Sequence, residues 1–246
     1  MSHIDLAASP SPSTALINPR YPDIAPPEDG VALVSRWDVG TPELQRAAIA
    51  HAQEAWHRIA WPEGLLSISW FAGLEGETVF VYSKWEDEAC ADRFAKTDGP
   101  TFLQGLKDVV PGLELRPPVR YQLYRSARRE NAPPVGCLVV VSVTFDGADA
   151  GRQRRWIDLV FEALAGDPSP HPGGISGHFH VSLDGTRVLN YAEWTSADAH
   201  RDALERAKGS VGHGPKWREV QSFPGLTASD VRRYTLVASM ESSDRG

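Results

Sequence analysis

An asparagine stands at the centre of a strand-like stretch, residues 187–194 (RVLNYAEW). Side chains two and four residues apart share one face of a strand, so Asn190 and Trp194 point the same way, and Tyr191 points the other way. A buried amide without a hydrogen-bond partner costs about 1–3 kcal/mol. Either the fold satisfies Asn190 or a ligand does. An amide could hold a phenolate or carbonyl oxygen as negative charge develops on it.

Two histidines, His178 and His180, lie two residues apart in the sequence GHFHV and share one strand face. Imidazole has an ordinary pKa near 6.5, which suits a general base that deprotonates a phenol or a carbon acid. A His-x-His pair can also bind a metal, but no third ligand is evident nearby, so no metal site is predicted. The alternative, histidines that only pack at the surface or at a sheet interface, stays open.

Four further residues are candidates for contacts with a substrate. Trp217 follows a Gly-Pro pair and is expected to close a pocket, and His213, in the Gly-rich turn GSVGHGP, is expected at its rim. The other two candidates are Phe179, which lies between His178 and His180, and Tyr191, which follows Asn190. His200, on the helix expected after Trp194, is a weaker candidate.

The chain is an internal duplication. Residues 64–85 (GLLSISWFAGLEGETVFVYSKW) align without a gap with residues 173–194 (GGISGHFHVSLDGTRVLNYAEW), and seven of the 22 positions are identical. Each copy reads as strand, Glu-Gly or Asp-Gly turn, strand, which is a strong hairpin signal. Trp85 matches Trp194, but Val81 stands where Asn190 stands. One working pocket, in the second half, and one degenerate half are therefore expected.

The flanks of the two hairpins agree as well. A strand-like run precedes each hairpin, with a helical segment between, and a second helix and a last strand follow it. The expected first strands are 30–37 and 136–145, the helices between are 41–60 and 149–165, and the last strands are 119–124 and 231–239. Each half is thus predicted to be a β-α-β-β-α-β, ferredoxin-like unit, and the fold class is α+β.

Helices cover only one face of such a four-stranded sheet, so a second sheet must cover the other face. A tandem chain can supply that sheet itself and close an α+β barrel as an intrachain pseudo-dimer. Pairing with a second chain through the barrel or through edge strands, giving a homodimer, is the alternative. The expected division is a flexible or draped arm (1–29), domain 1 (30–126), a linker (127–134), domain 2 (135–240) and a tail (241–246).

Composition excludes several classes of protein. The net charge of −7 argues against a general nucleic-acid binder. The sequence contains no run of 18 apolar residues, so no membrane span is predicted, and the N-terminus lacks the features of a secretory signal. With only two cysteines, a cytoplasmic protein is expected. No P-loop and no GxGxxG motif after a strand is present.

The unit of about 100 residues, and the sequence NYAEWTSADAH (190–200) after an Asp-Gly hairpin, resemble the antibiotic biosynthesis monooxygenase (ABM) family of the dimeric α+β barrel superfamily. The resemblance covers 30–126 and 136–240. Some relatives are cofactor-free anthrone oxygenases of aromatic polyketide pathways, and tandem members include the naphthocyclinone type. In those oxygenases an Asn and a Trp four residues apart on the third strand line the pocket. The resemblance assigns these roles to Asn190 and Trp194.

The resemblance implies a monooxygenase that oxidises a polycyclic aromatic polyketide, an anthrone or hydroquinone, with O2 as co-substrate and without metal or flavin. His178 or His180 would remove a proton, and Asn190 would stabilise the oxyanion. The expected partner is this small molecule, with no nucleic acid and no membrane. The alternatives are a polyketide cyclase or isomerase, or a non-catalytic component of a biosynthetic complex. A haem-binding reading is disfavoured because His200 has the wrong spacing from Trp194.

Overall fold

A computed structural model describes residues 16–18, 20–24, 30–113, 115, 117–166, 171–205 and 214–242. Among these, no helix is long and apolar enough to span a membrane. The strands are β1 (Leu16–Asn18), β2 (Val31–Asp38), β3 (Leu65–Gly73), β4 (Thr78–Trp85), β5 (Val119–Arg128), β6 (Cys137–Phe145), β7 (Gly174–Ser182), β8 (Arg187–Trp194) and β9 (Leu226–Glu241). The helices are α1 (Pro42–Arg58), α2 (Glu88–Lys96), α3 (Gly99–Val109), α4 (Ala150–Ala165), α5 (Ala197–Glu205) and α6 (Pro215–Gln221).

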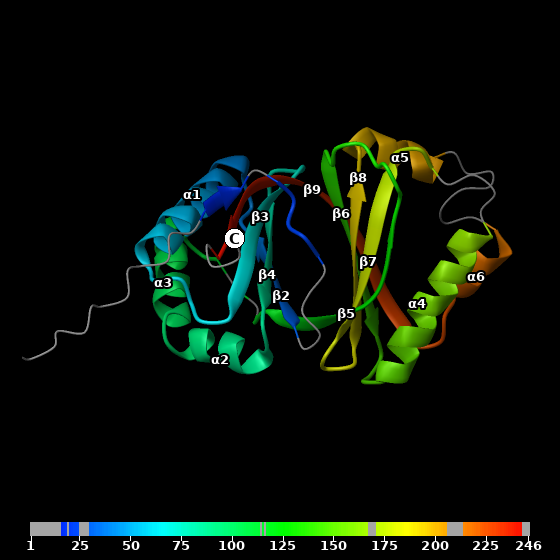
Figure 1. Cartoon of the computed structure of the whole chain (residues 1–246), viewed down its shortest axis with the longest axis horizontal. Coiled ribbons are helices and arrows are strands. Elements are labelled where there is room, and N and C mark those ends of the chain that lie inside the picture. The colour runs from blue at the N-terminus through cyan, green and yellow to red at the C-terminus, as the bar shows by residue number, and fades with distance from the viewer. Residues whose placement is uncertain are drawn as a thin grey trace, which may run out of the picture.

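The strands form one barrel that closes within the chain. The pairing order is β9-β3-β4-β2-β5-β7-β8-β6, and β6 pairs with β9 to complete the ring, while β1 adds to the outside edge of β9. Helices α1–α3 cover the sheet of the first half and α4–α6 cover the sheet of the second, so the layers run helix, sheet, sheet, helix (Figure 1). The predicted α+β pseudo-dimer of two ferredoxin-like units is confirmed.

The last strand of each half joins the two sheets. β5 pairs with β2 over Val119–Tyr121 and then with β7 as far as Arg128. In the same way β9 pairs first with β6 and then with β3, as far as Glu241. Both strands are longer than the sequence predicted. The added part of β5 takes its backbone hydrogen bonds from β7 of the other half, whereas β9 begins earlier along β6 of its own half and ends two residues later along β3. β5 therefore continues two residues into the segment expected as the linker.

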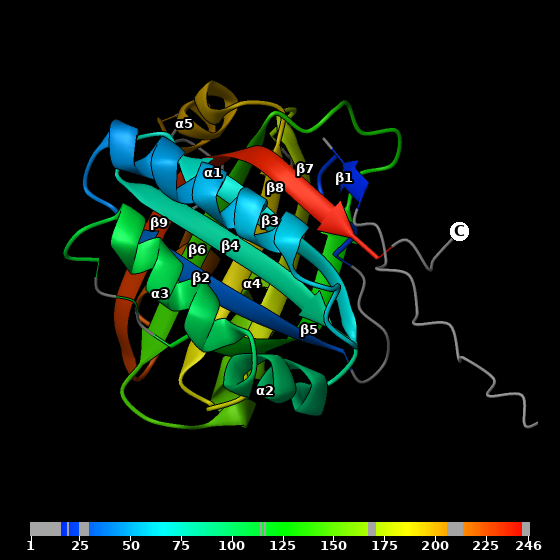
Figure 2. The ribbon, with the colours of Figure 1, turned by 90° about the vertical axis from the view of Figure 1, so that its left-hand side faces the viewer.

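Local sequence explains where the first helix of each half begins. Thr41 caps α1 by accepting the backbone N–H of Leu44, and Asp149 caps α4 by accepting that of Arg152. The Asp-Gly turn of the second hairpin places Gly185 at φ +74°, where a side chain would be strained. Figure 2 shows α1 and α3 lying across the sheet of the first half, with α2 at its lower end.

Each half contains one more helix than predicted. Helices α3 and α6 begin at two matching sequences, Gly-Pro-Thr-Phe (99–102) and Gly-Pro-Lys-Trp (214–217). Pro100 and Pro215 lie at the start of the two helices. Proline is well suited to that position, because its missing N–H would have no partner inside the helix. The unit is therefore β-α-β-β-α-α-β. The extra helix extends the cover over each sheet and brings Trp217 to the second one.

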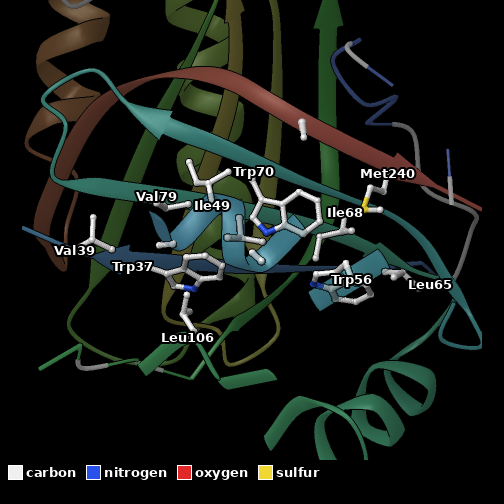
Figure 3. Close-up of a cluster of buried hydrophobic side chains, with 14 of the residues drawn as sticks. Trp37, Val39, Ile49, Trp56, Leu65, Ile68, Trp70, Val79, Leu106 and Met240 are labelled. Carbon is white, nitrogen blue, oxygen red and sulfur yellow. The ribbon is translucent and has the colours of Figure 1, made fainter. Parts of the chain in front are cut away.

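Three apolar layers hold the fold together. Aromatic side chains fill the inside of the barrel, among them Phe71, Phe80, Tyr82, Tyr191 and Tyr234. A second layer lies between the first sheet and its helices and includes Trp56 and Trp70 (Figure 3). The third layer lies between the second sheet and α4–α6, and it consists of two separate clusters.

Part of the predicted N-terminal arm is ordered against the barrel. β1 pairs with the end of β9, and Leu16 lies opposite Glu241. Ile24 is buried among the side chains inside the barrel, and Tyr21 packs on Phe71 with ring centroids 6.0 Å apart. The described part of the arm thus contributes to the barrel interior.

Candidate active site

Asn190 lies on the face of β8 that is covered by helices. Its neighbours across the sheet are Phe179 on β7 and Val141 on β6. Gly177 also lies on this face, and a Cβ atom there would come within 3.5 Å of the Asn190 Oδ1 atom. The glycine keeps the space beside the amide free of a side chain.

The side-chain oxygen of Asn190, Oδ1, is buried, and it has no hydrogen-bond partner among the described residues. Among the described residues, Asn190 lies between two clusters of buried apolar side chains. Val188, two residues before it, belongs to one cluster, and Ala192, two residues after it, belongs to the other. Val141, which lies opposite Asn190 on β6, packs against both clusters. A buried oxygen without a partner among the described residues fits a group that binds a ligand.

Trp194 lies further along the same face and is flanked by two imidazoles. Its ring centroid is 4.8 Å from that of His200 on α5 and 5.7 Å from that of His171, which precedes β7. Ser196 caps α5 by accepting the backbone N–H of Ala199, and this cap fixes the helix that carries His200.

Hydrogen bonds determine which nitrogen of each imidazole carries the proton. Arg233 Nε donates to His200 Nδ1 over 3.0 Å, and the backbone N–H of Gly173 donates to His171 Nδ1 over 3.1 Å. Each Nδ1 is thus an acceptor, so in the neutral ring the proton is on Nε2. Burial, with Arg233 beside it, lowers the pKa of His200 to about 4. The Nε2 atom of His171 is buried and lacks a partner in the part of the chain that the structure describes.

The structure separates His178 and His180 from Asn190, which corrects the predicted grouping of all three in one catalytic site. His178 lies opposite Tyr191 in the β7–β8 ladder, so both point into the barrel. His180 Nε2 lies 3.0 Å from the hydroxyl of Tyr82, also inside the barrel. A histidine of this pair could reach a substrate on Asn190 only through the sheet.

Burial governs the ionisation of these interior groups. It lowers the pKa of His178 and brings that of His180 down to about 3. It raises the pKa of Tyr191 well above its usual value. Tyr191 is fully buried in the aromatic core of the barrel, on the face opposite Asn190 as the strand alternation predicted. This corrects its assignment as a contact for a substrate bound at Asn190.

Two of the other predicted contacts lie on the Asn190 side of the sheet. Phe179 is buried there with its ring 5.2 Å from that of Phe161 on α4, and Trp217 on α6 packs against the same cluster. His213 lies outside the described residues. Sequence reasoning did not single out His171, and the one signal for it is its position just before the Gly-Gly pair that opens β7.

Among the described residues, no group of three or more His, Cys, Asp or Glu side chains is arranged to hold a metal ion. The face instead combines an unpaired amide oxygen, imidazole N–H groups and flat aromatic rings.

Comparison with solved structures places this architecture among known folds. An anthrone oxidase-like protein superimposes with a TM-score of 0.67 at 15% identity, over 88% of this chain and 95% of that one. A proposed monooxygenase from Lactobacillus acidophilus superimposes with a TM-score of 0.52 at 11% identity, over 86% of this chain and 96% of that one. One from Fusobacterium nucleatum also has a TM-score of 0.52, at 8% identity, over 87% of this chain and 94% of that one. At these identities the likeness shows a shared fold. No protein-family model and no curated protein sequence matches the chain.

Proposed function

We propose that the second half binds an anthrone or hydroquinone of the aromatic polyketide type on the Asn190 face. There it would oxidise the substrate with O2 to a quinone or hydroxylated product, without metal or flavin. The observation that carries the proposal is the buried side-chain oxygen of Asn190, which has no partner in the described part of the chain and shares a strand face with Trp194. The resemblance to ABM oxygenases and the fold shared with an anthrone oxidase-like protein support it.

The geometry suits a long, flat ligand. Asn190 and Trp194 are four residues apart, which spans about 13 Å along a strand. The amide oxygen would accept a hydrogen bond from a phenolic hydroxyl, and the rings of Phe179, Trp194 and Trp217 would contact the fused rings. If the amide is turned by 180°, its NH2 group faces the ligand and donates to a phenolate or carbonyl oxygen instead.

Activation of the substrate would rely on hydrogen-bond donors. The Nε2–H groups of His171 and His200 are the donors beside Trp194, since both Nδ1 atoms already accept a bond. A donor to the ketone oxygen of an anthrone stabilises the enolate and so favours loss of a proton from the ring CH2 group to solvent.

Oxidation then needs no electron source besides the substrate. The electron-rich anion transfers one electron to O2, the two radicals combine, and the resulting peroxide loses water. The CH2 group becomes C=O with one oxygen atom from O2, and the second oxygen atom leaves as water together with the two hydrogens. The protein would orient the substrate and stabilise its anion.

Oxygen uptake by chelator-treated protein with 1,8-dihydroxyanthrone tests the proposal. Asn190→Val installs the residue that the first half carries at this position, and Val81→Thr is the matched control in the first half. We expect Asn190→Val to lower kcat/KM about 10- to 100-fold, the effect of losing a buried hydrogen bond of about 1.5–3 kcal/mol, and Val81→Thr to leave it unchanged.

Equal uptake by wild type and Asn190→Val would contradict the proposal. Conversion of a pathway-type substrate without oxygen uptake would replace it with a cyclisation or isomerisation in the same pocket. Mass spectrometry with 18O2 distinguishes these outcomes, because oxygenation predicts one labelled oxygen atom in the product.

A further inference from the structure

A chain of hydrogen bonds lines one end of the barrel interior, on the side of the sheet away from Asn190. Ser126 Oγ lies 3.0 Å from His178 Nδ1, and His178 Nε2 lies 3.1 Å from Ser176 Oγ. The Ser176 hydroxyl is 2.7 Å from the carboxylate of Glu193. The four residues Ser126, His178, Ser176 and Glu193 are called the relay below.

The relay has a defined direction. Arg128 pairs with Glu193 over 2.6 Å, and a carboxylate held by a guanidinium only accepts hydrogen bonds. Ser176 therefore donates to Glu193 and accepts from His178 Nε2–H. His178 Nδ1 is then the free basic nitrogen, and it accepts from the hydroxyl of Ser126. This is the order of a nucleophile, a base and an orienting acid.

Backbone geometry places Ser126 in this position. The β5–β7 ladder shifts register between Leu123 and Arg125, and beyond the shift Ser126 lies opposite His178. Leu123 also packs inside the barrel. With regular alternation, residues three apart point to opposite faces, so without the bulge Ser126 would point outwards.

The relay opens into a cavity of about 740 Å³, a volume typical of small-molecule sites. Ser126 is exposed and lines the cavity together with His178 and Glu193. The apolar part of the wall consists of Tyr21, Pro22, Ile24, Leu123, Pro134 and Val135. The described arm thus supplies one side of the cavity and the linker supplies another.

The duplicated half shows that the fold does not require the relay. At the matching positions it has Ser69 in place of His178 and Lys84 in place of Glu193. Ser239 on β9 takes the place of Ser126, since it lies opposite Ser69 with the two hydroxyl groups 2.8 Å apart. In the first half Ser69 and Ser239 bond to each other, whereas the second half has a base and an acid.

We propose that Ser126 is a nucleophile activated by His178, in a second active site that hydrolyses carboxylic esters with an apolar acyl group. Ser126 Oγ would attack the ester carbonyl while its proton passes to His178 Nδ1, which then protonates the departing alcohol. Water would release the acid from the acyl-serine by the same route. Arg128 lines the cavity and has N–H groups beyond the one on Glu193, and these can stabilise the oxyanion.

A fluorophosphonate probe tests the nucleophile directly on the full-length protein. The serine oxygen displaces fluoride from phosphorus, and intact-mass and peptide mass spectrometry locate the adduct. We expect one adduct per chain, on Ser126. We expect none in Ser126→Ala, and labelling slowed about 100-fold or more in His178→Gln, the size of a general-base effect. Added imidazole should restore part of the rate in His178→Ala.

Ser239→Ala is the matched control, because Ser239 holds the equivalent position without a histidine, and its labelling should equal that of wild type. Circular dichroism of each variant confirms that it is folded. The proposal is overturned if wild type forms no adduct, if the adduct remains in Ser126→Ala, or if His178→Gln reacts at the wild-type rate. Hydrolysis of 4-nitrophenyl butyrate should follow the same order among the variants.

Discussion

The two halves of this chain have one architecture, but they fill the space between sheet and helices differently. In the first half, Val81 and Trp85 belong to a single cluster of buried side chains, in which Trp56 stacks on Phe94 with ring centroids 5.2 Å apart. In the second half, two clusters lie on either side of Asn190. Among the described residues, the first half places the apolar Val81 inside one cluster, whereas the second half places the polar Asn190 between two clusters that Val141 contacts in common.

Buried polar atoms without a hydrogen-bond partner occur in both halves, so they do not by themselves distinguish one half from the other. In the first half the indole nitrogens of Trp56 and Trp70 also lack partners among the described residues. Those atoms belong to large rings whose burial stabilises the core. The amide of Asn190 brings no comparable apolar surface, so its burial costs free energy that a ligand would recover.

The largest expected difference between the halves concerns their tryptophans. Trp85→Ala should lower the free energy of unfolding by about 3–5 kcal/mol, since it leaves a cavity in a large buried cluster. Trp194→Ala should cost less, because its cluster is smaller, but it should weaken binding of an aromatic ligand. Urea denaturation of both variants measures this, and an equal loss would mean that the two layers are packed alike.

The pH dependence of stability should come from the second half, because His178 and His180 stand where the first half has Ser69 and Phe71. The folded pKa of His180, about 3, lies below its unfolded value near 6.5. Between these values the unfolded chain binds more protons, so stability is lost as the pH falls from about 6.5 towards 3, by at most about 1.4 kcal/mol per pH unit for this group.

The double variant Tyr82→Phe/His180→Phe removes the hydrogen-bonded pair of Tyr82 and His180 without leaving either partner unpaired. It also places at position 180 a phenylalanine, the residue that the first half has at the matching position, 71. Urea midpoints at pH 7 and pH 5 should differ less in the variant than in wild type. An unchanged pH dependence would assign the effect to other groups, such as His200, whose pKa is also lowered, to about 4.

Exchange of the residues that distinguish the halves should change stability in opposite directions. Asn190→Val should raise the free energy of unfolding by about 1 kcal/mol, because an unsatisfied amide is replaced by an apolar group. Val81→Asn should lower it by about 1–3 kcal/mol. Chemical denaturation in the absence of ligand measures both, and a destabilised Asn190→Val would show that the fold itself satisfies the amide.

The smallest effects are expected at the helix caps, where the halves are equivalent. Thr41→Ala and Asp149→Ala each remove one side-chain bond to the start of a helix, and each should cost about 1 kcal/mol in thermal unfolding. A much larger loss for one of them would show that its helix supports its half more than the other helix does.

The repeat and the hairpin turns were sufficient to predict the fold, because period and turn chemistry are local signals. Helices α3 and α6 were missed because the Gly-Pro pair at the start of each resembles a turn. The added length of β5 depends on pairing with the other half, which no local pattern reports.

The site was predicted only in part, although the hairpin already contained the missing information. Across the Asp-Gly turn, partners on β7 and β8 have opposite parity, so His178 must share a face with Tyr191, and Phe179 must share one with Asn190. His171 and Ser126 could not have been found in this way. The position of His171 depends on a loop, and that of Ser126 depends on a bulge in a strand from the other half.

Equilibrium binding of anthraquinone, followed by quenching of tryptophan fluorescence, tests most directly whether the Asn190 face binds an aromatic ligand and the matching face of the first half does not. The account predicts one site per chain, with affinity lowered about tenfold in Asn190→Val, as expected for one hydrogen bond, and unchanged in Val81→Thr. Two equal sites per chain, or equal affinity in Asn190→Val and wild type, would contradict it.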